Sequence, residues 1–211
     1  MHAGSDGQPC RPAARAVFQH EGHDQTQLVG QRAEAGQQVG TGLRMAPVMA
    51  QVFADRGDRV LVVRGDNGWD EISPYGGTQV WDTTRGGVTE ERLEAGDLGM
   101  GDIAEGALAG GDAVTNAEVC RAAFGMRRMH PELPLPSDID AVRAVVIANA
   151  AAALAAHSAA VAAADGEYVQ GSLRDRVRAH LVDARAAVEA LLAGQPVAVE
   201  MTVPAVASKP M

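Results

Sequence analysis

Apolar residues in the middle of the chain change from a helical spacing to a continuous run. Between Met45 and Arg56 they recur at helical intervals, and Gly57 follows at the position of a C-terminal cap. The aliphatic run from Val60 to Val63 comes next, and such a run is typical of a strand buried on both faces. A helix that leads into a buried strand is half of a parallel α/β unit, so the predicted fold class is α/β.

Two short strand candidates follow this strand. They span residues 78–83 and 88–93, and Gly86 and Gly87 lie between them. A glycine pair between two strand candidates indicates an antiparallel hairpin. The glycine-rich stretch 96–111 is expected to be mostly loop.

Three helices are expected in the second half of the chain. The first runs to Phe124 from a cap at Thr115 or Asn116. The second, rich in Ala and Val, extends from Ser137 to Ala164, and its low polarity implies that protein covers most of its surface. The third is a single helix over residues 172–194, with one apolar stripe and a capping-box pattern at its start. Together these elements predict parallel strands and a hairpin packed by Ala-rich helices.

The two ends of the chain differ from this central region. Residues 1–42 are rich in Gln, Gly, Arg and His and have neither a helical nor a strand period. Such a segment buries too little apolar surface to offset its ordering entropy, so we expect it to be disordered or poorly packed. The folded domain is therefore expected to span residues 43–195, with a tail of little structure at 196–211.

Composition excludes several classes of partner. The net charge is −9, which argues against nucleic acid or an anionic membrane as the main partner. Cys10 and Cys120 form no disulfide framework, so a reduced cytoplasmic setting is expected. No apolar run is expected to span a membrane, because Asn149 and His157 interrupt the stretch 145–164. An anionic substrate would need a bridging cation or a local basic patch.

The sharpest candidate for chemistry is the adjacent pair Asp70 and Glu71. It follows the buried strand and a loop containing Gly65 and Gly68, where open α/β sheets place their sites. In an irregular loop both carboxylates can converge on a hard cation, and magnesium takes one or two carboxylates together with water and phosphate oxygens. The pair alone is also compatible with a solvated acidic loop, the more common role of such residues. No catalytic or substrate-binding residue is assigned.

The order of longer motifs carries a resemblance to a known family. The motifs are RVLVVRGDNGWDEIS, TQVWDTTRGGVTEERLEAGDLGM, LAGGDAVTNAEVCRAAF, AVVIANAAAALAAH and SLRDRVRAHLVDARAAVEALLAG. From about Met45 to Gly194 the chain resembles the C-terminal half of the anthranilate phosphoribosyltransferases. The resemblance implies part of a nucleoside-phosphorylase-like α/β domain, usually in a homodimer. It also implies transfer of phosphoribosyl from phosphoribosyl pyrophosphate to anthranilate in tryptophan biosynthesis. Asp70 and Glu71 fall on the family's magnesium-binding pair, which favours the metal role.

The sequence also departs from that family. The GTGGD loop, the Lys-His-Gly-Asn-Arg segment and the His-Pro-Ala-Met-Arg region should precede this half, and the sequence contains none of them. Trp69 stands where the family usually has Leu, and Arg64 where it often has His. We therefore expect a truncated chain with a non-homologous segment 1–42 and impaired activity. The alternatives are an inactive fragment that acts as a binding or dimerising module, and a pyrimidine nucleoside phosphorylase of the same fold.

Overall fold

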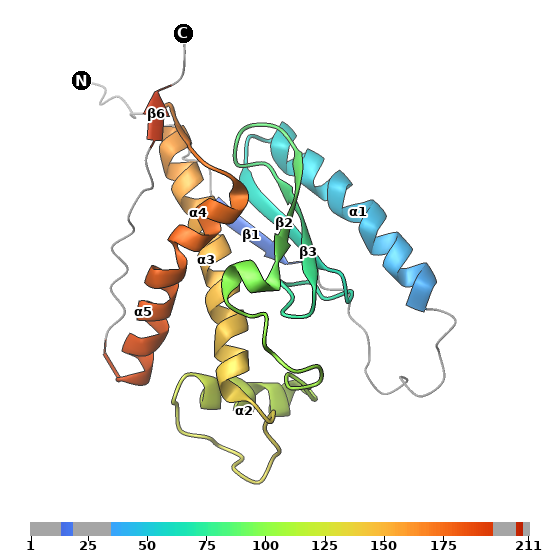
Figure 1. The fold of residues 1–211 in the computed structure, drawn as a ribbon, viewed down its shortest axis with the longest axis vertical. Coiled ribbons are helices and arrows are strands. Elements are labelled where there is room, and N and C mark those ends of the chain that lie inside the picture. The colour runs from blue at the N-terminus through green and yellow to red at the C-terminus, as the bar shows by residue number, and fades with distance from the viewer. Residues whose placement is uncertain (1–13, 19–34, 196–205, 209–211) are drawn as a thin grey trace, which may run out of the picture.

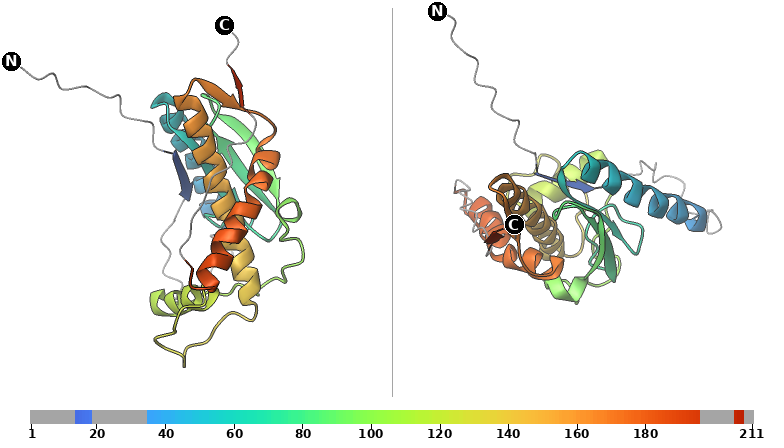
Figure 2. Two further views of the ribbon diagram at one scale, coloured as in Figure 1. Left: turned by 90° about the vertical axis from the view of Figure 1, so that its left-hand side faces the viewer. Right: turned by 90° about the horizontal axis from the view of Figure 1, so that it is seen from above.

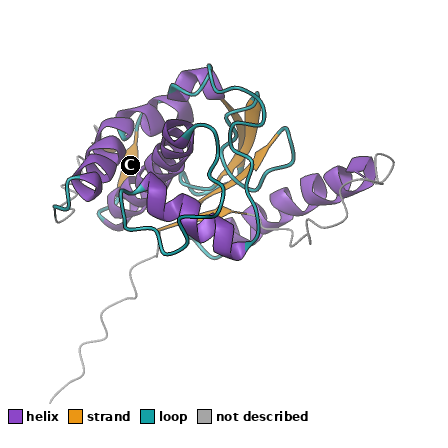
Figure 3. Ribbon diagram, turned by 90° about the horizontal axis from the view of Figure 1, so that it is seen from below, coloured by secondary structure: helices purple, strands orange, loops and turns teal. Residues whose placement is uncertain are grey.

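The protein is built on a mixed four-stranded sheet with helices on both faces (Figures 1 and 3). The computed structural model describes residues 14–18, 35–195 and 206–208, with side chains described for 45–195. The strands of the sheet, in spatial order, are β1 (Ala14–Phe18), β2 (Arg59–Gly65), β3 (Gly77–Asp82) and β4 (Thr89–Glu94). β1 pairs parallel to β2, and the pairs β2–β3 and β3–β4 are antiparallel. The predicted α/β class and hairpin are confirmed.

Strand β2 lies in the middle of the fold and is buried on both faces, as its aliphatic run predicts. Leu61 and Val63 belong to the larger core, which contains α3 (Ile139–Ala164). Val60 and Val62 face the other way and pack with residues of α1 (Ala35–Asp55). The view from above shows the sheet between these two helices (Figure 2, right). Successive side chains of a strand alternate between faces, which produces the two cores.

Two stretches of the segment 1–42 differ from the prediction of disorder. β1 pairs with β2 over Ala14 to Phe18, and α1 begins at Ala35, ten residues before the predicted start at Met45. The rest of residues 1–34 lies outside the described residues. A strand that pairs with a distant segment has no local signature beyond a few apolar residues, so the periodicity of the sequence did not reveal it.

The long Ala-rich helix α3 begins and ends almost where predicted. The side chain of Asp138 caps it by accepting a hydrogen bond from the Ala141 amide at 2.9 Å, and Gly166 follows its end with a φ of +76°. By length and composition alone α3 would suffice to cross a membrane, so the polar residues Asn149 and His157 do not by themselves rule out a span. Of its most apolar window, 56% is buried inside the fold, against β1, β2 and the C-terminal helices. This burial is characteristic of the core helix of a globular protein.

The predicted single helix over residues 172–194 is two helices in the structure. α4 (Leu173–Ala179) starts at the predicted cap, where Ser172 Oγ accepts a hydrogen bond from the Asp175 amide, and α5 (Leu181–Leu192) continues after His180. The His180 side chain is buried, and its Nε2 lies 3.1 Å from Ser158 Oγ on α3. This contact with another helix lies at the break, and the apolar stripe continues through it.

The remaining elements are short. Asp112 caps α2, and the predicted caps Thr115 and Asn116 lie inside the helix, because the Asp112 carboxylate accepts from the Thr115 amide at 2.8 Å. The stretch 96–111 is mostly loop, as predicted, and a 3₁₀ turn precedes most of it. These elements are α2 (Ala113–Ala123), η2 (Ala95–Leu98), β5 (Glu167–Val169) and β6 (Val206–Ser208). β5 and β6 form a separate two-stranded sheet.

Candidate metal site at the end of strand β2

The loop that follows β2 is irregular, as the sequence predicts, and is closed by backbone hydrogen bonds. The Gly65 amide donates to the Trp69 carbonyl at 2.9 Å, and the Gly68 amide donates back to the Gly65 carbonyl at 2.9 Å. Gly68 has a φ of +89°, in the left-handed region that favours glycine. This tight turn connects the end of β2 to Asp70 and Glu71. The buried strand therefore fixes where both acids begin.

The far side of the loop is fixed by buried contacts. The Ile72 side chain is 1% exposed and belongs to the main core. Its amide donates to Asn149 Oδ1 on α3 at 3.0 Å, and the next amide, that of Ser73, donates to Thr78 Oγ1 at 2.9 Å. The acidic pair is therefore held between two anchored segments, the turn before it and the buried residues after it.

A third acid of the loop, Asp66, has a structural role. Both of its carboxylate oxygens accept from the Arg92 guanidinium on β4, and one also accepts from the Gly77 amide. The hydrogen bond from Arg92 holds the pKa of Asp66 below its usual value, even though partial burial acts in the opposite direction. Asp66 therefore tethers the loop to the hairpin and remains ionised at neutral pH.

Asp70 and Glu71 lie on one cavity between the loop and helix α3. The cavity has a volume of about 400 Å³ and is lined by Asp70, Glu71, Val146, Asn149, Ala150 and Ala153. The two acids are therefore brought together, as the sequence suggests for a loop of this kind. Val146, Ala150 and Ala153 make the opposite wall largely apolar, and an apolar wall strengthens electrostatic interactions inside the cavity.

The electrostatics of the pair suit a cation. Burial raises the pKa of Glu71, and the neighbouring Asp70 carboxylate raises it further. Both effects disfavour a second negative charge, and a bound cation would relieve both. Because metal and proton compete for the same oxygens, cation binding at this pair would weaken as the pH falls through the raised pKa of Glu71.

The donor set fits magnesium better than a transition metal. Within the described part of the chain, no three His, Cys, Asp or Glu side chains are grouped as a metal site. Two carboxylates alone offer hard oxygen ligands and leave most positions to water and to a phosphorylated ligand, as magnesium prefers. Asp70 and Glu71 are therefore the residues that would hold it.

The sequence did not reveal the wall of the cavity or the tether between Asp66 and Arg92. One signal was available, because Asn149 is the single polar residue of α3 between Arg143 and His157. A polar side chain alone in an apolar helix usually has a buried partner. That partner is the acidic loop, which lies 77 residues away in the sequence.

Comparison with known proteins places this chain within a family. Residues 39–176 match the model of the glycosyl transferase family, a/b domain. The chain belongs to this family. Asp70, Glu71 and Asn149 all lie in the matched region, as do β2, the hairpin and α3.

Individual relatives carry a more specific name, and each matches part of the chain. A protein named anthranilate phosphoribosyltransferase from Saccharopolyspora erythraea is 46% identical over 54% of this chain, and the match spans 29% of the relative. Proteins of the same name from Nocardioides and Leifsonia xyli are 42% and 37% identical over 63% and 70% of the chain. These matches span 36% and 38% of the relatives. The predicted resemblance is confirmed, and the chain spans about a third of the length of these relatives.

Proposed function

We propose that this chain carries the metal and pyrophosphate site of an anthranilate phosphoribosyltransferase, a glycosyltransferase. The reaction would transfer phosphoribosyl from phosphoribosyl pyrophosphate to the amine of anthranilate, in tryptophan biosynthesis. The observation that carries the proposal is the position of Asp70 and Glu71 on one cavity at the end of β2. The names of the relatives support the choice of substrates.

The residues present suit the electrostatic part of such a reaction. Loss of pyrophosphate leaves positive charge on the ribose and puts negative charge on the leaving group, so the reaction needs charge neutralisation and orientation and no covalent nucleophile. Magnesium, when bound, would neutralise the pyrophosphate as a Lewis acid. Asp70 and Glu71 would hold the ion at a fixed place, and the apolar wall from α3 would limit the water around it.

A metal titration tests the proposal. We expect the chain to bind Mn²⁺, a spectroscopic substitute for magnesium, and Asp70→Asn/Glu71→Gln to bind it far more weakly. The expected loss exceeds the roughly 10–100-fold that removal of an outer-shell partner costs. Isothermal titration at several pH values would also show the wild-type affinity falling as the pH approaches the raised pKa of Glu71 from above.

The matched control is Asp102→Asn/Glu105→Gln. These two acids are exposed in the loop before α2, and their neutralisation changes the net charge by the same amount. The control should keep the wild-type affinity for Mn²⁺. Equal affinities of the wild type and Asp70→Asn/Glu71→Gln would contradict the metal assignment.

Activity is a separate measurement. Release of pyrophosphate from phosphoribosyl pyrophosphate that depends on anthranilate would support the transferase. Metal binding without such release would favour the inactive binding module. Phosphorolysis of thymidine or uridine would favour the pyrimidine nucleoside phosphorylase.

The proposal includes a cytoplasmic homodimer, which the family resemblance implies. Met45, Val48 and Val52 form an apolar stripe along α1, and their exposed fractions are 47%, 55% and 51%. Exposed apolar patches of this kind are commonly covered by a partner subunit. Sedimentation velocity at increasing protein concentration is expected to show a dimer. A single monomeric species at every concentration would contradict it.

A further inference from the structure

Asn149 is out of place on helix α3 unless it has a specific partner. Its neighbours Ala148, Ala150 and Ala151 belong to an Ala-rich stretch, and asparagine is a poorer helix former than alanine. Alanine at this position would therefore favour the helix itself. The reason for the asparagine must lie in what its side chain contacts.

The Asn149 amide makes two hydrogen bonds of opposite kind. Its Oδ1 accepts from the Ile72 amide at 3.0 Å, and its Nδ2 donates to the Val145 carbonyl at 2.9 Å. The Ile72 N–H can only donate and the Val145 carbonyl can only accept, so the side-chain amide fits in one orientation. Asn149 therefore joins the helix backbone to the loop backbone through a fixed planar group.

The position of this link gives it a consequence for the acidic pair. Ile72 directly follows Glu71, and Asn149 lines the same cavity as Asp70 and Glu71. Two neighbouring carboxylates repel each other and favour a more open, better hydrated loop. The hydrogen bond from Ile72 to Asn149 opposes that opening, because it holds the loop backbone against α3.

We propose that Asn149 is a positioning residue that holds the acidic loop against α3, so that Asp70 and Glu71 line the cavity in an arrangement ready for a divalent cation. This inference rests on the proposed function, since it assumes that the pair binds a metal. Loss of a residue that orients metal ligands by hydrogen bonding typically lowers metal affinity by roughly 10–100-fold. The proposed effect of this link is preorganisation of the acidic pair.

Asn149→Ala tests the proposal, because alanine continues the helix and removes both hydrogen bonds. Two quantities are measured on the 211-residue chain, hydrogen exchange of loop 66–76 without metal and the affinity for Mn²⁺. We expect faster exchange around Ile72 and an affinity lower by roughly 10–100-fold.

Ser158→Ala is the control for a purely structural role. Ser158 lies on α3, like Asn149, but far from the acidic loop. Its replacement removes the buried hydrogen bond between Ser158 and His180. It should lower the midpoint of urea unfolding and leave the Mn²⁺ affinity unchanged. If Ser158→Ala weakened Mn²⁺ binding as much as Asn149→Ala, the role of Asn149 would be structural and the proposal would be overturned.

The remaining outcomes separate this proposal from the one on which it rests. If Asp70→Asn/Glu71→Gln lost Mn²⁺ and Asn149→Ala bound it like the wild type, positioning would be refuted and the metal site would stand. Unchanged loop exchange in Asn149→Ala would also refute positioning. If the wild type did not bind Mn²⁺, the proposed metal site would fail, and this proposal would fail with it.

Discussion

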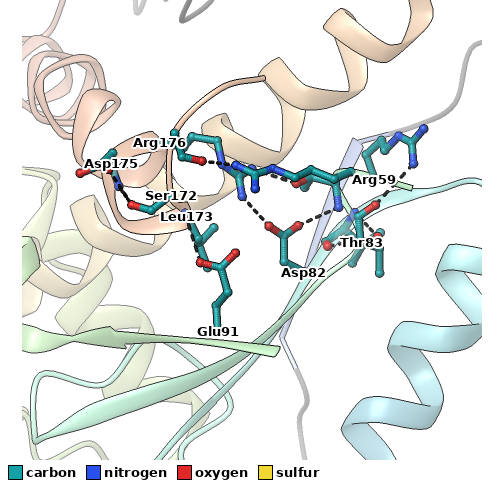
Figure 4. A network of polar contacts seen from close by, with 12 residues as sticks. Arg59, Asp82, Thr83, Glu91, Ser172, Leu173, Asp175 and Arg176 are labelled. Atoms are coloured by element: carbon teal, nitrogen blue, oxygen red, sulfur yellow. Dashed lines mark hydrogen bonds and ion pairs between the residues drawn. The ribbon is translucent and has the colours of Figure 1, made fainter. Parts of the chain in front are cut away.

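Replacing Arg176 with methionine is expected to destabilise the fold by about 3–5 kcal/mol. Arg176 on α4 is 2% exposed and forms an ion pair with Asp82, also 2% exposed, at the end of β3 (Figure 4). Its guanidinium also donates to Thr84 Oγ1 at 2.8 Å. Without Arg176 the Asp82 carboxylate would stay buried without its cation. Urea unfolding followed by circular dichroism would measure the loss.

The double variant Asp82→Asn/Arg176→Met separates the ion pair from packing. Asparagine can still accept the hydrogen bond that the Thr84 amide donates to Asp82 at 2.7 Å, and it carries no charge to leave uncompensated. The double variant should therefore be more stable than Arg176→Met alone. Arg92→Met, which breaks the exposed pair with Asp66, should cost much less, because water screens that pair. Equal stabilities of the single and double variants would contradict the argument.

The expected loss of stability follows from the two segments that the Arg176–Asp82 ion pair connects. It links α4 to the turn that follows β3, and a second contact lies nearby, where the Leu173 amide donates to Glu91 Oε2 on β4 at 3.3 Å (Figure 4). Together these contacts hold the start of the C-terminal helices against the hairpin. The pair is separated by 94 positions along the chain. Nothing local marks Arg176 as buried, since Arg174 and Arg178 on the same helix are exposed.

Local periodicity was sufficient for the elements whose burial follows a simple pattern. The aliphatic run of β2, the glycine pair of the hairpin and the apolar length of α3 each predicted the right structure within a few residues. It failed where pairing over a long distance decides the structure. β1 depends on hydrogen bonds to β2, and the break at His180 lies where the side chain meets Ser158 on α3.

Of the candidate site, the sequence predicted the residues on the loop and not the wall that α3 forms. Asp70 and Glu71 stand out because they follow a buried strand and a turn rich in glycine. On the α3 side the only signal is the isolated Asn149, because apolar residues surround this Ala-rich helix on nearly every side and mark no face of it. Which face of α3 meets the loop depends on how the helix packs, so the role of Asn149 required the three-dimensional structure.

Gly65→Ala is expected to weaken both folding and metal binding. Gly65 is the buried last residue of β2, and an added Cβ would lie 2.6 Å from Asn67 Oδ1 and 2.7 Å from Ser73 Cβ. Asn67 can turn away, but Ser73 is fully buried and its Cβ is fixed to the backbone. The overlap therefore forces a backbone shift, which costs about 1–3 kcal/mol in a packed interior. Urea unfolding would measure this loss.

The same substitution reaches the acidic pair through the turn. The Gly65 amide holds the Trp69 carbonyl, and Trp69 immediately precedes Asp70, so a shift at Gly65 displaces the pair. We expect Gly65→Ala to bind Mn²⁺ more weakly than the wild type in the absence of urea, where the chain remains folded. Gly87→Ala is the matched control, because nothing lies within 4 Å of its added Cβ and its φ is not positive. Wild-type Mn²⁺ affinity in Gly65→Ala would show that the strand end does not set the position of the carboxylates.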